Sequence, residues 1–239
     1  MNNCYQKKDN QPYIGIIKLD TKFQRLLGDI GNPNTWNFPV VYQVIEGIYP
    51  ENIVNYDDYG VLISAIKAAR YLEEKGVDAI TTTCGFMAKY QKNISNSVNV
   101  PVFTSSLLQI PMIYQILNKK KRIGVITANS KNLTEEHLYG AGIQNIPLII
   151  MGMENREYFQ QIFIQNQPGF INKERIIKEI IETVKNMLNF NKDIGAIVLE
   201  CTNMSPYAYD IQKISNLPVF DIYTLMQWFY SGLIKSFFN

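Results

Sequence analysis

The sequence predicts an α/β protein made of two half-domains related by a pseudo-twofold axis, each a parallel sheet flanked by helices, with a cleft between them. Two observations support this fold class. Residues 78–110 match residues 195–227 in one register without a gap, which indicates an internal repeat. In each half, apolar runs of strand length alternate with helical segments, a pattern typical of right-handed βαβ units in a parallel sheet.

The register of the repeat aligns two cysteines. Cys84 falls on Cys201, and the Pro-Val-Phe triplet at 101–103 falls on the triplet at 218–220. The sequence of each half therefore predicts, in order, a strand, a long helical region, a strand that ends in cysteine, a helix, and a short strand that leads into another helix. We expect the two cysteine strands to occupy equivalent places in the two sheets.

The opening strands and the long helices support this layout. IGIIKLDT at 14–21 resembles IGVITANS at 123–130, so the two halves begin alike. Apolar residues at helical spacing predict helices over 61–76 and 172–188, the second with Asn172 as its N-cap. Both helices directly precede a cysteine strand, and we assign their apolar stripes to the core.

The boundary between the halves is marked by charge. The lysine-rich segment 118–122 reads as a solvated turn, and the aromatic, apolar segment 223–238 is expected to pack back across the first half. The sequence thus predicts a first half-domain of residues 1–117 plus 221–239 and a second of residues 118–220. We favour closure of the fold by the last segment, although it could also form the interface of a homodimer.

Composition excludes several classes of function. The 239 residues are 46% hydrophobic, enough for a sizeable core, and the formal net charge is only +2. No basic stripe indicates a nucleic acid or a membrane surface as partner. The N-terminus has no apolar core of a signal peptide and no run approaches membrane-spanning length, so we expect a cytoplasmic protein that binds a small carboxylic or amino acid.

The cysteine and histidine counts bear on redox and metal chemistry. The three cysteines are Cys4, Cys84 and Cys201, an odd number that argues against a disulfide framework. His137 is the single histidine, and the chain has no CxxC pair, so no metal site is expected. We expect His137 to cap a helix or to be exposed to solvent, and we expect Cys4 to have no role in chemistry.

The candidate active site lies in the cleft, at the carboxyl ends of the strands. Ligands bind outside these ends in open parallel sheets, and Cys84 and Cys201 both occupy such ends, as do Asp20 and Thr21. If the halves face each other, the two thiols flank one cleft from opposite sides. Nearby hydroxyl groups that could hold a substrate carboxylate are those of Thr83, Thr104, Ser105 and Thr202.

Two acid/base groups on opposite faces of one carbon can invert its configuration. A thiolate on one face removes the α-proton of a carboxylic acid, and a thiol on the other face returns a proton to the planar intermediate. A helix N-terminus lowers the pKa of a cysteine, so we expect the strand-to-helix turns at Cys84 and Cys201 to favour a thiolate at neutral pH.

The motifs GIIKLDT, GDIGNP, TTTCGF, PVFTSSLLQ, IGVIT and LECTN, in that order, resemble the aspartate/glutamate racemase family, which includes hydantoin racemases. The resemblance covers nearly the whole chain. It implies two α/β half-domains, racemisation without pyridoxal phosphate or another cofactor, and Cys84 and Cys201 as the two catalytic thiols.

Other positions follow from the same resemblance. It implies that Asp20 and Thr21 orient the substrate amine or tune a thiol, and Thr202 matches the family's Cys-Thr element. The sequence departs from glutamate racemases after both cysteines. They have Asn-Thr where this chain has Gly85 and Phe86, and a histidine where it has Asn203. The substrate-binding residues we predict are Asp20, Thr21, Thr83, Gly85, Thr104, Ser105, Thr202 and Asn203.

Several readings stay open. The first hypothesis is a cofactor-independent racemase of aspartate, glutamate or a relative. A thiol isomerase acting on a small dicarboxylate such as maleate would use the same scaffold, while the second thiol argues against an arylmalonate decarboxylase, which relies on one. From other classes, a two-lobed protein could bind a small acid without chemistry, or the thiols could form a redox-sensing disulfide.

Three charged residues near the strand ends are harder to assign. Glu200 could tune Cys201, but side chains alternate along a strand, so we favour a structural role. Lys18 and Arg25 could anchor a carboxylate, yet a place on the surface is equally compatible with the sequence.

Overall fold

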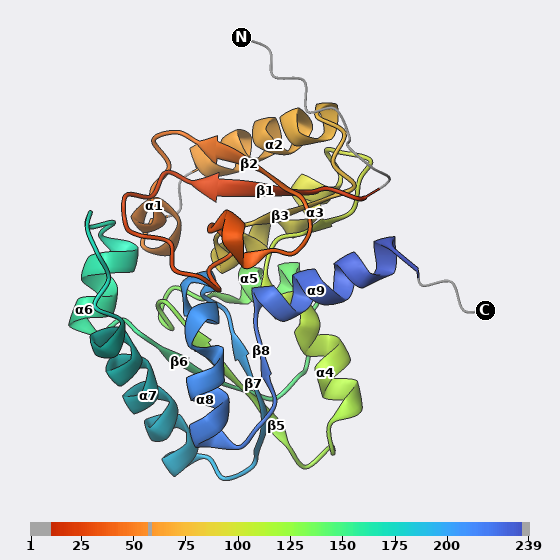
Figure 1. Cartoon of the computed structure of the whole chain (residues 1–239). Coiled ribbons are helices and arrows are strands. Elements are labelled where there is room, and N and C mark those ends of the chain that lie inside the picture. Colours follow the sequence, from red (N-terminus) through yellow and green to blue (C-terminus); the bar gives the residue numbers. More distant parts are fainter. Residues whose placement is uncertain (1–10, 57–58, 236–239) are drawn as a thin grey trace.

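The computed structural model describes residues 11–56 and 59–235, and it contains two parallel four-stranded sheets (Figure 1). The first sheet has the order β2-β1-β3-β4 and the second the order β6-β5-β7-β8. The strands, in chain order, are β1 (Ile14–Leu19), β2 (Val40–Ile45), β3 (Ala79–Thr82), β4 (Val102–Phe103), β5 (Arg122–Thr127), β6 (Leu148–Gly152), β7 (Ile194–Leu199) and β8 (Val219–Phe220). The predicted fold class is confirmed.

The central strands are apolar because helices cover both faces of each sheet. In β7, Ala196, Ile197, Val198 and Leu199 are all fully buried, as near-continuous apolar strands of parallel sheets usually are. The edge strands β2 and β6 were not predicted, since we expected a long helical region before each cysteine strand. Their side chains are largely half-buried, which leaves a weak pattern in the sequence.

Both long predicted helices exist. The helices are α1 (Pro50–Val54), α2 (Tyr59–Glu74), α3 (Gln91–Ser95), α4 (Ile110–Ile116), α5 (Glu135–Gly140), α6 (Glu157–Phe159), α7 (Lys173–Phe190), α8 (Ala208–Ser215) and α9 (Ile222–Leu233). The Asn172 side chain accepts a hydrogen bond from the backbone N–H of Arg175, so the predicted N-cap of α7 is confirmed. Helix α7 buries Ile176, Ile180 and Val184 along one stripe.

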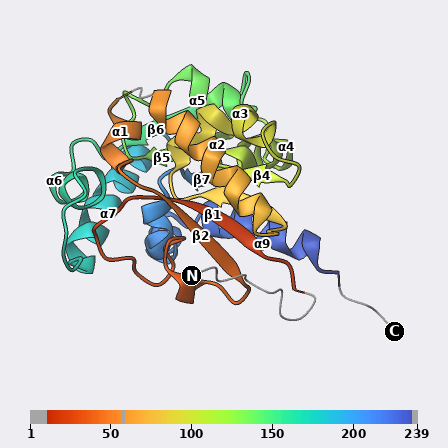
Figure 2. The same ribbon diagram turned by 90° about the horizontal axis from the view of Figure 1, so that it is seen from above.

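The last helix leaves the second sheet and packs against the first. Ile222, Leu225 and Met226 of α9 belong to one cluster of buried residues with Ile14 and Phe103 of the first sheet. Figure 2 shows α9 running close to β1 and β2. The chain therefore crosses from one half to the other twice, which ties the two sheets together.

Further contacts join the halves where the carboxyl ends of β3 and β7 meet. The Thr202 hydroxyl donates to the carbonyl of Thr83 at 2.7 Å, and the Ser106 hydroxyl donates to the carbonyl of Leu199 at 2.6 Å. Nearby, the loop after β1 is held by the segment 163–171, because the Asn166 side chain accepts from the Lys22 N–H. Within the described ranges, no helix is long and apolar enough to cross a membrane.

His137 sits at the start of α5. Its Nδ1 accepts from the backbone N–H of Thr134, so the predicted capping role is confirmed, but the ring is buried rather than solvated. Cys4 and residues 236–239 lie outside the described residues.

Candidate active site

A small pocket lies between the two sheets, at the carboxyl ends of their strands, and both cysteines line it. Leu19, Thr83 and Cys84 come from the first half, and Glu200 and Cys201 from the second. Its cavity of about 20 Å³ is little more than one water molecule needs. The structure therefore brings the two predicted thiols to one closed site.

The two cysteines occupy equivalent turns. Each follows a buried strand and precedes a 3-10 helix, Gly85–Tyr90 in the first half and Thr202–Tyr207 in the second. The carbonyl of Cys84 accepts from the N–H of Met87 at 3.1 Å, and that of Cys201 accepts from Met204 at 3.0 Å. Both side chains are buried, at 8% and 7% exposure.

The electrostatics of the thiols differ from our expectation. We predicted a lowered pKa at each turn, but burial raises the pKa of Cys84 to about 12, and the charge of Glu200 adds to this. The pKa of Cys201 is also raised, first by burial and second by Glu200. Hydrogen bonds from backbone N–H groups at the turns lower the pKa of each thiol, as predicted, but the cost of desolvating a buried thiolate is larger and raises it. With the pKa values raised in this way, both groups are thiols at neutral pH.

Glu200 lines the pocket and also has the structural contacts that we favoured for it from the sequence. Strand β7 ends at Leu199, so alternation no longer governs the next side chain. Its Oε2 accepts from the Thr127 hydroxyl at 2.7 Å and from the N–H of Ala128 at 3.3 Å. Burial raises the pKa of Glu200 to about 7, although these two donors oppose the shift.

Arg25 supplies the positive charge of the site. Its guanidinium donates to Asp29 at 3.0 Å, to the side-chain oxygen of Asn203 at 2.9 Å and to the Thr21 hydroxyl at 3.0 Å. The side chain is only 9% exposed, and its Nε has no partner among the described residues. Lys18, the other cation considered from the sequence, is absent from the lining and lies over the ring of Tyr42.

Seven of the ten predicted site residues line the pocket, namely Thr21, Thr83, Cys84, Gly85, Cys201, Thr202 and Asn203. The other three lie outside it. The Asp20 carboxylate accepts from the Gly47 N–H, the Thr104 hydroxyl donates to Gln91, and the Ser105 hydroxyl accepts from the Leu107 N–H. These three side chains hold turns of the fold in place.

Much of the pocket wall is apolar, and sequence reasoning missed this part. Phe23 and Phe163 meet edge to face, with ring centroids 5.2 Å apart, and Phe86, Val54 and Ile164 complete this side. Apolar residues of the wall carry no signal that separates them from the core. Arg25 could have been retained from its place after the first strand, but nothing in the sequence places it beside Asn203.

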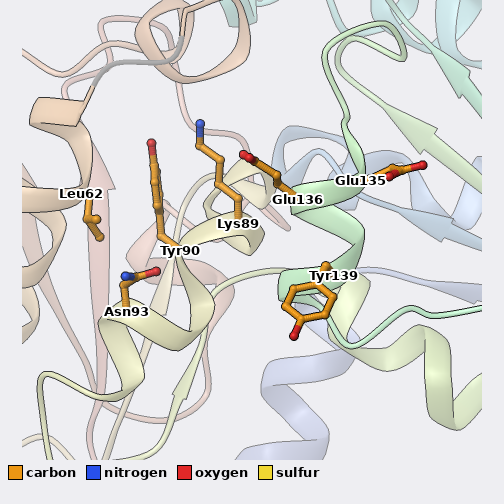
Figure 3. A pocket seen from close by; sticks show the side chains of 7 residues that line it. All are labelled: Leu62, Lys89, Tyr90, Asn93, Glu135, Glu136 and Tyr139. Carbon is orange, nitrogen blue, oxygen red and sulfur yellow. The ribbon is translucent and has the colours of Figure 1, made fainter.

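A second hollow is larger but lacks the chemistry. It encloses about 610 Å³ near α2, α3 and α5 and is lined by Leu62, Lys89, Tyr90, Asn93, Glu135, Glu136 and Tyr139 (Figure 3). Neither cysteine lines this hollow. The closed pocket at the two thiols is therefore the candidate active site.

Comparison with known proteins relates the chain to several enzymes in sequence. No protein-family model matches it. A dimethylsulfoniopropionate lyase of Durusdinium sp. clade D shares 27% identity with it over 93% of this chain and 75% of that protein. Dimethylsulfoniopropionate lyase 7 of Emiliania huxleyi shares 28% identity over 94% of this chain and 68% of that protein.

Solved structures are similar in fold at low sequence identity. The allantoin racemase of Klebsiella pneumoniae has a TM-score of 0.65 at 13% identity, over 93% of this chain and 87% of that one. Glutamate racemase of Francisella tularensis has a TM-score of 0.56 at 17% identity, over 97% and 86%. Unliganded arylmalonate decarboxylase has a TM-score of 0.56 at 12% identity, over 93% of both chains. The chain has the two-domain α/β fold that these racemases and this decarboxylase share.

Proposed function

We propose that this protein is a cofactor-independent enzyme that removes the proton from the carbon next to a carboxylate, with Cys84 and Cys201 as its acid/base groups. The observation that carries this proposal is the meeting of two buried thiols, from equivalent turns of opposite halves, at one small pocket. Similarity to dimethylsulfoniopropionate lyases favours a lyase that acts on a carboxylate with a β-sulfonium group.

The reaction is a β-elimination. The substrate carboxylate lies near Arg25, whose Nε–H is the donor without a partner among the described residues. One cysteine first loses its own proton to water while the site is open. As the thiolate it then takes the α-proton; the electron pair of the C–H bond forms the Cα–Cβ double bond, and the Cβ–S bond breaks with its electron pair leaving on sulfur. From dimethylsulfoniopropionate this gives acrylate and dimethyl sulfide, and the proton passes from the thiol to water when the site opens.

The apolar wall supports a sulfonium substrate. A sulfonium group is a cation without N–H donors, so it needs no hydrogen-bond acceptors when buried, and aromatic rings attract it. Phe23, Phe86 and Phe163 supply such rings. An amino-acid ammonium group carries three donors that need acceptors on burial, and Glu200 is the one carboxylate among the described lining residues.

A racemase of aspartate, glutamate or a relative is the second candidate. The equivalent placement of the thiols favours it, because inversion needs one base and one acid on opposite faces of the carbon. In this reaction the second thiol returns the proton that the first removes, and no bond to the β-carbon breaks. A thiol isomerase of a small dicarboxylate would need a second cation, and Arg25 is the only one among the described lining residues.

The test uses the purified protein without added cofactor. It is incubated with dimethylsulfoniopropionate, with release of dimethyl sulfide measured in the gas phase, and separately with single amino acids in heavy water, with loss of the α-proton followed by NMR. Release of dimethyl sulfide by the wild type that is lost in C84A or C201A would establish the lyase. Exchange of an amino-acid α-proton without release of dimethyl sulfide would establish the racemase. Cys4→Ser, outside the described residues, is the matched control. The absence of both reactions would refute the proposal and favour a binding protein.

A further inference from the structure

We propose that Glu200 acts in its protonated form, as a hydrogen-bond donor from Oε1 to the carboxylate of the bound substrate. The inference rests on the proposed function in one respect, namely that the site takes a small carboxylate. It goes beyond that function because it gives a second recognition group to the pocket and makes binding depend on a proton.

The two oxygens of Glu200 have different surroundings. Oε2 accepts from Thr127 and Ala128 and so ties the end of β7 to the end of β5. Oε1 is buried and has no partner among the described residues, although the residue is only 1% exposed. Buried polar atoms of folded proteins almost always have a partner. In a carboxylate with only a structural role, both oxygens would have hydrogen-bond partners. We therefore infer that the partner of Oε1 is a ligand.

Oε1 lies against Gly85, a residue of the pocket wall. A side chain at Gly85 would overlap both Oε1 and the carbonyl of Glu200, so the carboxyl group occupies space that the missing side chain leaves beside Cys84. Gly85, Glu200 and Cys201 all line the same cavity. The carboxyl group thus lies between the turns of the two thiols, where a substrate must sit.

The surroundings favour the neutral acid. Burial raises the pKa of Glu200 to about 7 against the two hydrogen bonds that lower it, and Thr127 at the end of β5 and Ala128 after it are uncharged. The other titratable groups near the pocket are the two thiols, Arg25 with its partner Asp29, and His137, which packs on Phe86. A bound carboxylate adds a negative charge and raises the pKa of Glu200 further, so substrate binding takes up a proton.

Because Thr127 and Ala128 donate to Oε2, the proton resides on Oε1, which turns the orphaned acceptor into a donor. The neutral acid also benefits the thiols. The negative charge of Glu200 raises the pKa of both cysteines, and protonation removes this repulsion at the moment when one of them must become a thiolate.

The experiment measures binding and does not depend on turnover. Propionate, a carboxylate without a leaving group, is titrated by calorimetry at pH 7.5 in two buffers that differ in ionisation enthalpy, which gives the protons taken up. Wild-type protein is expected to take up part of a proton, and its affinity is expected to fall by up to about tenfold per pH unit between the pKa of Glu200 in the free protein, about 7, and its higher pKa in the complex. Glu200→Gln keeps a neutral donor and an acceptor for Thr127, so it should bind with no uptake and no pH dependence between pH 7 and 9.

Two further variants complete the test. Glu200→Ala removes the donor and should weaken binding at pH 6.5 by roughly 10- to 100-fold. Glu154→Gln, whose carboxylate bonds Ser130 outside the pocket, should behave as wild type. Wild-type binding without proton uptake, uptake that persists in Glu200→Gln, or no binding of propionate at millimolar concentration would each overturn the inference. Proton-coupled binding without turnover of any substrate would instead refute the proposed function and leave the inference standing.

Discussion

The turns at Cys84 and Cys201 share one backbone design but differ in the residues on either side of the thiol. The repeat aligns Thr83 with Glu200 and Gly85 with Thr202. In the first half, the Thr83 hydroxyl accepts from the N–H of Leu19; in the second, Glu200 accepts from Ala128 at the corresponding strand end.

The residues that differ between the two turns fit each other across the cleft. Thr202 reaches the carbonyl of Thr83, whereas Gly85 has no side chain and leaves room for Glu200. The symmetric scaffold thus carries a single acid among the described lining residues, Glu200, between the turns of the two thiols, and its charge raises the pKa of both.

The largest expected effect comes from the thiols themselves. Cys84→Ala and Cys201→Ala should each lower turnover by about 10²- to 10⁴-fold, because an acid/base group in contact with the reacting carbon is lost. For an elimination, the two losses should differ by more than tenfold, since one thiol removes the proton. If both variants instead lose racemisation equally, and each retains exchange of the α-proton with one enantiomer, the two thiols are equivalent acid/base groups. Steady-state rates of the purified variants decide between these outcomes.

Next in size is the dependence of stability on pH. The pKa of Glu200 is about 7 in the folded protein and about 4.3 in the unfolded chain, so the folded state binds the proton more tightly. The resulting stabilisation is complete below pH 4.3 and is lost as pH rises through 7. It amounts to about 4 kcal/mol, of which about 2.5 kcal/mol is lost between pH 5 and pH 8. Urea unfolding at pH 5 and pH 8 should show this difference in wild type and not in Glu200→Gln. An equal dependence in the two proteins would contradict a buried, titrating Glu200.

The space at Gly85 offers a smaller and more local test. Gly85→Ala should destabilise the protein by about 1 to 3 kcal/mol, because the added Cβ overlaps the carbonyl and carboxyl groups of Glu200. The control Gly232→Ala lies in α9, where the added Cβ meets no atom within 4 Å. That variant should be stabilised by about 0.5 to 1 kcal/mol, since alanine favours a helix. Thermal unfolding of both proteins measures the two shifts, and equal stability of Gly85→Ala and wild type would rule out the close packing.

The smallest effect concerns the bond across the cleft. Thr202→Val removes the hydroxyl that donates to the Thr83 carbonyl, and a single hydrogen bond contributes about 0.5 to 1.5 kcal/mol. Thr104→Val, at a hydroxyl outside the pocket, should cost a similar amount of stability without changing turnover. A loss of turnover in both variants would show that stability alone, and not the contact between the halves, governs activity.

Much of the fold and of the site follows from the repeat, since it identifies both cysteine strands and places Thr83 and Thr202 beside them. The strands β2 and β6 escaped prediction because half-buried edge strands show no clear periodicity. Arg25 and Glu200 were considered and left out, because their positions depend on a loop and on the end of a strand. The prediction of a lowered thiol pKa was wrong for a related reason. The depth of burial depends on the tertiary structure, and the sequence of the turn does not show it.

The closed pocket has a consequence for any measured affinity. A cavity of about 20 Å³ cannot hold a small carboxylic acid, so the binding-competent form is one in which the halves, or the loops between them, stand further apart. Asn166 bonds both Lys22 and Asp20, and Phe23 pairs with Gly169, so these contacts hold the loop after β1 against the segment 163–171 of the second half. If the open form makes up about 1% of the free protein, the apparent Kd is about 100-fold weaker than the intrinsic one. Substitutions in this loop contact would then tighten binding without touching the ligand.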